Sequence, residues 1–322
     1  MSERYYYGNS EQIRGVEEYR LVEGKANNMR MFHIRNGLGL DITISADRCA
    51  DISRLVFKGD NFGYFSPTGN VAPTFYDARD AEMVRSFTGG FLTTCGLTNV
   101  GAVNNDGEDL PLHGRISNQP ASHCYWTEDK DSFIVNATIR EAALGMNKLE
   151  LNRNYMISKN SNEIIINDTI KNVGEKTSPC MILYHMNMAY PLLSEDAKIE
   201  IRSDNITGRN ERATKLLDKW SEISAPRENE EETCYYHHFK DEGFARIYND
   251  KIKKGVEISY DAKSLPSFTQ WSMFGKYDYV LGLEPGNCYP DGRSRVRKDN
   301  KLVELKEQEE VKYSIKIKIV EE

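Results

Sequence analysis

The sequence lacks the features that define several whole classes of protein. No apolar run among its 322 residues approaches the ~18 residues of a membrane span. Its first residues do not show the charged-then-apolar pattern of a secretory signal, so we expect a cytoplasmic protein. The formal net charge is -7, and an acidic chain matches neither nucleic acids nor anionic membranes, which attract basic surfaces. We therefore expect no nucleic-acid and no membrane partner.

Cysteine and glycine motifs are also missing. The six cysteines are scattered and form no Cys-x-x-Cys pair, which argues against a zinc knuckle or a thioredoxin-type site. In a reducing compartment we expect them to be free thiols. The glycine-rich stretch SFTGGFLTTCGLTNVG lacks the spacing of the phosphate-binding loops, and the chain contains no Gly-x-Ser-x-Gly elbow.

Alternation of apolar and polar residues dominates what is present. Residues 38–45, 132–139 and 311–320 carry an apolar side chain at every second position, which is typical of strands with one buried face. The pair Asn36-Gly37 between two such runs predicts a hairpin turn. Further strands are expected at 148–157, 163–171, 197–201, 243–248 and 255–260.

Helical patterns are scarce, with two short candidates within 75–87 and 211–220. Many strands with few helices predict an all-β protein, built as an antiparallel sandwich or barrel. Hydrophobic residues make up 39% of the chain and charged residues 28%, which supports a sizeable core. Nothing resembles a flexible linker, so we interpret residues 1–322 as a single domain.

Three apolar stretches contain polar residues that a buried strand excludes unless they are paired or used. In LYHMNMAYP, alternation places His185 and Asn187 on one face of the strand. In DLPLHGRISNQP, a glycine between His113 and Arg115 allows an unusual turn that aims side chains into a pocket. In YVLGLEPGN, Glu284 ends an apolar strand. Taken singly, each of these polar residues is equally well explained as a hydrogen-bonded residue of the core or as a surface residue.

Two further stretches carry weaker signals. His237 and His238 are adjacent, so in a strand they point to opposite faces and at most one of them belongs to a given site. Arg48 lies among small residues with two aspartates nearby, and a local salt bridge explains it equally well.

Taken together, these stretches resemble the aldose 1-epimerase (galactose mutarotase-like) superfamily, and most closely a bacterial aldose 1-epimerase-like branch without an assigned substrate. The resemblance is carried, in the family's order and from about residue 87 to 287, by GGFLTTCGLTNVG, LPLHGRISNQPA, LELNRNY, PCMILYHMNMAYPLL, CYYHHF and YVLGLEPGN. It implies a large antiparallel β-supersandwich whose concave face binds a sugar ring. The implied activity is anomer interconversion by acid/base ring opening, without a metal or cofactor.

The resemblance also implies roles for particular residues. His185 takes the place of the general acid toward the ring oxygen, and Glu284 that of the base toward the anomeric hydroxyl. Their ordinary pKa values favour an ionised Glu and a readily protonated His near neutrality. His113 takes the place of the histidine that binds and orients the sugar, with Asn187 beside His185 and Trp271 offering an apolar face.

The sequence departs from the family's pattern at two substrate-binding positions. The arginine expected before the Leu-His-Gly element is absent from LTNVGA, which leaves Arg115 or Arg48 to supply the charge. The expected aspartate is not evident either, and His237 or His238 stands at roughly its place. The specificity for galactose or glucose is therefore not implied.

Two alternatives remain open at this point. His113, His185, His237 and Glu284 form a ligand set suited to zinc, iron or manganese, as in a metal-dependent sugar isomerase. A non-catalytic sugar-binding protein is the other, because a fold does not fix a function. The sequence does not identify the sugar, and Arg48 and Arg115 leave an anionic one open. It leaves a homodimer open as well.

Overall fold

The computed structural model describes residues 3–322, and most of its strands belong to three antiparallel sheets. The first sheet has five strands, which follow one another in sequence and in space. They are β1 (Gly15–Arg20), β2 (Arg30–Arg35), β3 (Leu40–Ser45), β4 (Asp51–Phe57) and β5 (Asp60–Asn61).

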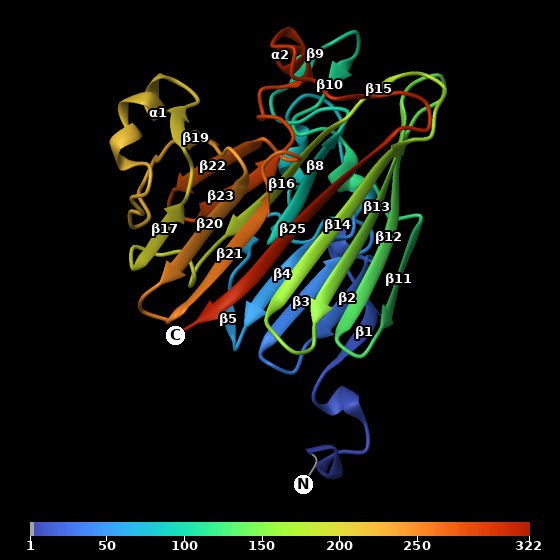
Figure 1. Cartoon of the computed structure of the whole chain (residues 1–322), viewed down its shortest axis with the longest axis vertical. Helices are drawn as coiled ribbons and strands as arrows, with labels where there is room; N and C mark the ends of the chain where they lie inside the picture. Colours follow the sequence, from blue (N-terminus) through green and yellow to red (C-terminus); the bar gives the residue numbers. More distant parts are fainter. Residues whose placement is uncertain (1–2) are drawn as a thin grey trace.

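The second sheet has eight strands, and in Figure 1 it lies in front of the other two sheets. The C-terminal strand lies inside this sheet, between strands that come from the middle and the late part of the chain. In spatial order the strands are β11 (His123–Glu128), β12 (Ser132–Ala142), β13 (Lys148–Ser158), β14 (Glu163–Asn172), β25 (Glu310–Glu321), β21 (Lys254–Asp261), β20 (Glu242–Asn249) and β17 (Ala197–Ile201).

The third sheet has six strands and brings together segments that are far apart in sequence. Its spatial order is β18 (Asn205–Gly208), β19 (Thr233–His238), β22 (Ser267–Phe274), β23 (Tyr279–Gly286), β16 (Met181–Met188) and β8 (Leu92–Leu97). Three two-stranded ladders complete the β-structure: β6 (Tyr64–Phe65) with β7 (Gly89–Gly90), β9 (Asn104–Asn105) with β10 (Asp109–Leu110), and β15 (Ser178–Pro179) with β24 (Glu304–Leu305).

Helices in the described part of the chain are short. The α-helices are α1 (Glu211–Lys215) and α2 (Arg293–Lys298). The 3-10 turns are η1 (Glu3–Tyr6), η2 (Ser10–Gln12), η3 (Gly24–Ala26), η4 (Pro73–Phe75), η5 (Glu82–Arg85), η6 (Ile116–Asn118) and η7 (Leu217–Lys219). Between residues 3 and 322, no helix is long and apolar enough to cross a membrane.

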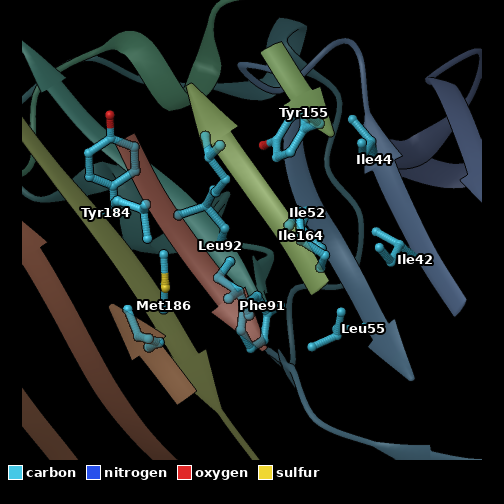
Figure 2. Close-up of a cluster of buried hydrophobic side chains, with 14 of the residues drawn as sticks. Ile42, Ile44, Ile52, Leu55, Phe91, Leu92, Tyr155, Ile164, Tyr184 and Met186 are labelled. Atoms are coloured by element: carbon cyan, nitrogen blue, oxygen red, sulfur yellow. The ribbon is translucent and has the colours of Figure 1, made fainter. Parts of the chain in front are cut away.

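One continuous core joins the three sheets. In β12, burial alternates along the strand, and the predicted apolar face of Phe133, Val135, Ala137 and Ile139 points inward. Figure 2 shows part of this core, to which Ile42 of the first sheet, Ile164 of the second sheet and Met186 of the third contribute. All residues of β16 are buried, on both faces of the strand. Because side chains alternate between the two faces, one face of β16 packs in this core and the other points away from it.

A charged network lies inside the core between the sheets. Arg153 of β13 is fully buried and contacts Asp168 of β14 and Asp51 of β4 at 2.7 Å each. Asp51 accepts hydrogen bonds from the backbone N–H and the hydroxyl of Thr94, and Asp168 accepts one from Tyr184. The network therefore links all three sheets, and it satisfies charges that are expensive to bury unpaired.

The strand predictions are confirmed, with differences at the ends of elements. The predicted hairpin turn at Asn36-Gly37 is a loop of residues 36–39, in which Oδ1 of Asn36 accepts from the N–H groups of Leu38 and Leu40. Leu38 therefore lies in the loop and is exposed, not on the buried face. The helix expected within 75–87 is limited to the short turn η5, with η4 ending at its first residue, and α2 was not predicted. All six cysteines are buried and free.

Candidate active site

A cavity of about 430 Å³ opens on the face of the third sheet that points away from the core. Its size lies within the range of small-molecule sites in proteins. Strands β16, β19, β22 and β23 supply one part of its lining, and loops supply the rest. The lining residues are Met83, Val84, Phe87, Gly101, Ala102, Leu112, His113, His185, Arg209, Glu232, Cys234, Thr269, Trp271, Glu284 and Pro290.

Two neighbouring strands place His185 and Glu284 side by side in this cavity. In the antiparallel pair of β16 and β23, Leu183 is opposite Gly286 and Met186 is opposite Leu283, so His185 faces Glu284 across the ladder. Side chains alternate between the faces of a strand, so Met186 points into the core while His185 points into the cavity. Nε2 of His185 lies 3.2 Å from Oε1 of Glu284.

Gly282 leaves the room that this pair needs. It precedes Glu284 by two residues on β23 and therefore lies on the same face of the strand. A Cβ atom at this position would lie 2.2 Å from Oε1 of Glu284 and 3.3 Å from Cε1 of His185. The carboxyl group of Glu284 thus occupies space that any other residue at 282 would fill.

Three rings surround the imidazole of His185. The ring centroids of Trp271, His113 and Phe87 lie 5.4, 5.6 and 6.0 Å from it. His113 reaches this place from a loop whose backbone turns through φ 57° at that residue, and its N–H donates to the carbonyl of Gly101. The rings shield His185 from water on three sides while the cavity leaves it accessible to a ligand.

A charged group faces the pair from the loop between β18 and α1. Arg209 lines the cavity, and its Nη2 donates to the carbonyl of Pro290 at 3.3 Å. Its Nε lies 3.7 Å from a carboxylate oxygen of Asp291. Beside it, the carboxylate of Glu232 accepts a hydrogen bond from the indole N–H of Trp271 at 2.8 Å.

Burial shifts the protonation of the pair toward neutral forms. The pKa of Glu284 is raised well above its usual value because the carboxyl is buried, an effect that the positive charge of Arg209 opposes and the negative charge of Glu232 adds to. Burial, with a smaller effect of His113, lowers the pKa of His185 to about 3. Burial likewise lowers the pKa of His113 to about 4. The expectation of an ionised Glu and a readily protonated His is therefore wrong for the free protein, since water does not solvate these groups.

Several buried polar atoms in the cavity have no hydrogen-bond partner. They are Nδ1 of His113, Nδ1 of His185, Oγ1 of Thr269 and Oε1 of Glu284. Buried polar atoms are almost always paired in folded proteins, so a convergent group of unpaired ones indicates a place that a polar ligand fills. Thr269 lies directly opposite Glu284 on β22, so its hydroxyl belongs to the same surface.

Of the residues predicted from the sequence, His113, His185, Trp271 and Glu284 meet in this cavity. Arg48 and Arg115 do not. Arg48 is buried, and its guanidinium donates to the carbonyls of Val71, Ser86 and Ser117, where it fastens loops to the sandwich. Arg115 lines a separate hollow and donates to the carbonyl of Asp109. In the cavity Arg209 supplies the positive charge.

Asn187 and His237 also lie outside the cavity lining. Asn187 follows His185 by two residues on β16, and its amide is buried and donates to the carbonyls of Gly90 and His185. His237 is fully buried and lies within hydrogen-bond distance of Ser203 and Gln270. It points to the opposite face of β19 from Cys234, which lines the cavity, because the two are three residues apart.

Arg209 and Glu232 are the charged cavity residues that sequence reasoning missed. Glu232 lies in the acidic run at 227–233, and its only signal in the sequence is that it precedes Cys234 by two positions. Arg209 lies in an irregular segment between β18 and α1, where no periodicity indicates its direction. Phe87, which lies in a loop, was missed for the same reason, and Thr269 and Cys234, on β22 and β19, were not singled out either.

The ligand set of the metal-dependent alternative is not assembled. His237 is held on the other side of the third sheet, away from His113, His185 and Glu284. In residues 3–322 no group of three or more His, Cys, Asp or Glu side chains has the arrangement needed to hold a metal ion.

The family model "Domain of unknown function (DUF4432)" matches residues 26–319, and the chain belongs to this family. Among solved structures, a proposed aldose 1-epimerase from Klebsiella pneumoniae superposes with a TM-score of 0.89 at 22% sequence identity. That match covers 98% of this chain and 87% of the other. A comparison with curated proteins finds no match.

Two further structures extend the likeness. A galactose mutarotase-like protein from Clostridium acetobutylicum gives a TM-score of 0.69 at 14% identity, covering 97% of this chain and 100% of that one. Galactose 1-epimerase from Lactobacillus acidophilus gives 0.66 at 13% identity, covering 96% and 99%. These similarities show that the chain has the galactose mutarotase-like fold, as its resemblance to that superfamily predicted.

Proposed function

We propose that this protein is an aldose 1-epimerase, which interconverts the anomers of a sugar by opening and reclosing its hemiacetal ring. The observation that carries the proposal is the placement of His185 and Glu284. A proton acceptor and a proton donor lie 3.2 Å apart on the floor of a cavity large enough for a small ligand. Neither Oε1 of Glu284 nor Nδ1 of His185 has a hydrogen-bond partner in the protein.

Ring opening requires two proton transfers at one carbon–oxygen bond. A base removes the proton of the anomeric hydroxyl while an acid protonates the ring oxygen, and the bond between the anomeric carbon and the ring oxygen breaks. Glu284 as carboxylate and His185 as imidazolium supply this base and this acid. The product is the open-chain aldehyde, with the proton now on Glu284 and the imidazole neutral.

Ring closure uses the protonation state that burial favours. After rotation about the bond next to the aldehyde carbon, neutral His185 accepts the proton of the attacking hydroxyl while Glu284 protonates the carbonyl oxygen. The pair holds one proton throughout ring opening and ring closure. Groups positioned in this way typically contribute ~10²–10⁴-fold each to the rate. The chemistry needs no metal and no cofactor.

The remaining cavity residues bind and enclose the sugar. Neutral His113 donates or accepts a hydrogen bond toward a sugar hydroxyl, because its lowered pKa keeps the imidazole uncharged. Trp271 presents an aromatic face of the kind that packs against the apolar C–H edge of a sugar ring. Arg209 and Glu232 offer hydrogen bonds to hydroxyls on the other side of the cavity.

An anomerisation screen tests the proposal. We would measure anomer exchange by NMR exchange spectroscopy for neutral, phosphorylated and acidic aldoses, with Glu284→Gln as the inactive variant and Glu175→Gln, at an exposed site, as its control. We expect acceleration by the native protein and by Glu175→Gln, retained after treatment with a chelator, and at least 10²-fold less with Glu284→Gln. Absence of acceleration with every sugar would contradict the proposal, and activity lost with the chelator would favour the metal-dependent alternative.

A further inference from the structure

The cavity has an apolar side and a polar side, and the reactive pair lies between them. The apolar side consists of Met83, Val84, Phe87 and Leu112. The N–H of Leu112 donates to the carbonyl of Asp80, so the loop that carries Leu112 lies against the segment that carries the other three. This apolar side borders His185, because the ring of Phe87 lies 6.0 Å from the imidazole.

The polar side consists of Arg209, Glu232 and the carbonyl of Pro290. Arg209 donates to Pro290, and both residues line the cavity. This side lies beyond Glu284 from His185, because β23 separates β16 from β22, β19 and β18 in the sheet, and Glu232 and Arg209 adjoin β19 and β18. Asp291, 3.7 Å from Arg209, and Glu232 balance the positive charge. A substrate therefore meets no uncompensated cation among the lining residues.

The chemistry of a pyranose fixes which of its groups faces each side. The reacting bond joins the anomeric carbon to the ring oxygen. Carbon 2, with its hydroxyl, adjoins the anomeric carbon, whereas carbon 5, with its substituent, adjoins the ring oxygen. With Glu284 at the anomeric hydroxyl and His185 at the ring oxygen, the hydroxyl of carbon 2 points to the polar side. The substituent of carbon 5 then points to the apolar side.

We propose, building on the function proposed above, that the substrate is a neutral 6-deoxyaldose, which carries a methyl group on carbon 5. A methyl group fits against Met83, Phe87 and Leu112 without leaving a polar atom unpaired. A hydroxymethyl group would place a hydroxyl against these apolar side chains, and a carboxylate or phosphate would place a charge there, which is far more costly. The apolar side contains no side chain that offers a hydrogen bond to either.

Matched sugars that differ only at carbon 5 test this inference. For the galacto, gluco and manno configurations, in both enantiomeric series, we would compare the 6-deoxyhexose, the hexose, the uronate and the corresponding pentose by anomer-exchange rate. We expect at least one 6-deoxyhexose to exceed its hexose in kcat/KM by about tenfold to 10²-fold, and its uronate and pentose by more than tenfold. Equal rates within twofold, or preference for the hexose, uronate or pentose, would overturn the inference.

A substitution on the apolar side gives a second test. Val84→Thr adds a hydroxyl at nearly constant volume at an exposed position in the lining, so the fold is retained. We expect it to reduce the preference for the 6-deoxyhexose over the hexose by roughly two- to tenfold, the effect of one hydrogen bond. Val103→Thr, also at an exposed position but outside the lining, is the matched control and should leave the ratio unchanged. An identical ratio in both variants and the native protein would contradict the assignment of the apolar side.

Binding measurements separate this inference from the proposed function. Affinities of the same sugars for Glu284→Gln, followed by NMR titration, report recognition without catalysis. If no sugar is anomerised but the 6-deoxyhexose binds more tightly than its hexose, the inference stands and the proposed reaction fails. If sugars are anomerised without this preference, the reaction stands and the inference fails. If no sugar is anomerised and no 6-deoxyhexose binds more tightly than its hexose, both the proposed reaction and the inference are contradicted.

Discussion

Gly282 lies two residues before Glu284 on the same strand, and a Cβ atom at Gly282 would lie 2.2 Å from Oε1 of Glu284. The missing side chain therefore sets where the carboxyl rests relative to His185.

Gly282→Ala should move the carboxyl of Glu284 without disturbing the sheet, because the displaced atom ends a side chain and is not part of the backbone. A displacement of about 1 Å in a catalytic group costs about 10²-fold in rate. We expect a loss of that size in anomer exchange with an unchanged circular dichroism spectrum. Gly8→Ala, whose new Cβ meets nothing within 4 Å, is the control. Full activity of Gly282→Ala would show that the carboxyl does not need its present position.

The pH dependence of the rate should reflect the shifted pKa values of the pair. The active form carries one proton, so the rate falls when His185 gains a second proton, with a pKa of about 3, and when Glu284 loses the last one, at a pKa well above its usual value. These are properties of the coupled pair, observed as the two limbs of a kcat/KM profile. We expect the acid limb of kcat/KM to lie below pH 5 and the alkaline limb well above the usual glutamate pKa, measured by anomer exchange. A fall in kcat/KM toward acid pH that is centred near the usual histidine pKa of ~6.5 would contradict this expectation.

Glu284 should reduce the stability of the folded protein at neutral pH. Its pKa is raised on folding, so the folded state binds the proton more tightly, and the stability that this binding adds is present below pH 4.5 and is lost as pH rises toward the folded pKa. Glu284→Gln removes this loss. We expect its Tm to exceed that of the native protein at neutral pH, by about 1–2 °C for each kcal/mol gained in a chain of this length, and by less at pH 4.

The exposed-site variant Glu175→Gln controls for the change in net charge and should not alter the Tm. A Tm difference for Glu284→Gln that is absent, or that does not grow with pH, would mean that the carboxyl is not held in a neutral form by burial.

The same substitution at Arg209 and at Arg115 should have different effects on kcat/KM and on its pH profile. Arg209 lines the cavity and its charge lowers the pKa of Glu284, whereas Arg115 lies in another hollow. We expect Arg209→Met to lower kcat/KM and to move the alkaline limb of its pH profile to higher pH. Arg115→Met should leave both unchanged. The reverse pattern would restore Arg115 as the substrate-binding arginine that the sequence suggested.

The strands could be predicted because the residue pattern that specifies each strand lies within a short stretch of sequence. In β12 the order Phe133, Val135, Ala137 and Ile139 alternates with polar residues, and a strand with one buried face follows directly from that period. Helix boundaries were less accurate, since the turns at 73–75 and 82–85 are fastened by loop contacts such as the buried Arg48, not by a helical pattern.

His185, Glu284 and His113, which meet in the cavity, could be singled out from the sequence because each interrupts an apolar stretch in a context that resembles a known superfamily. Arg209 was not, because it stands in an irregular segment whose direction depends on contacts with Pro290 and Asp291, far along the chain.

The sequence by itself determined the all-β class, the faces of the strands and the polar residues that interrupt them, since these depend on the order of neighbouring residues. Only the tertiary structure decided which of those residues meet. The register of β16 against β23 brings His185 to Glu284, and the burial that follows from packing reverses the protonation expected from their ordinary pKa values. Both depend on contacts between segments about a hundred residues apart, which alternation within one strand does not encode.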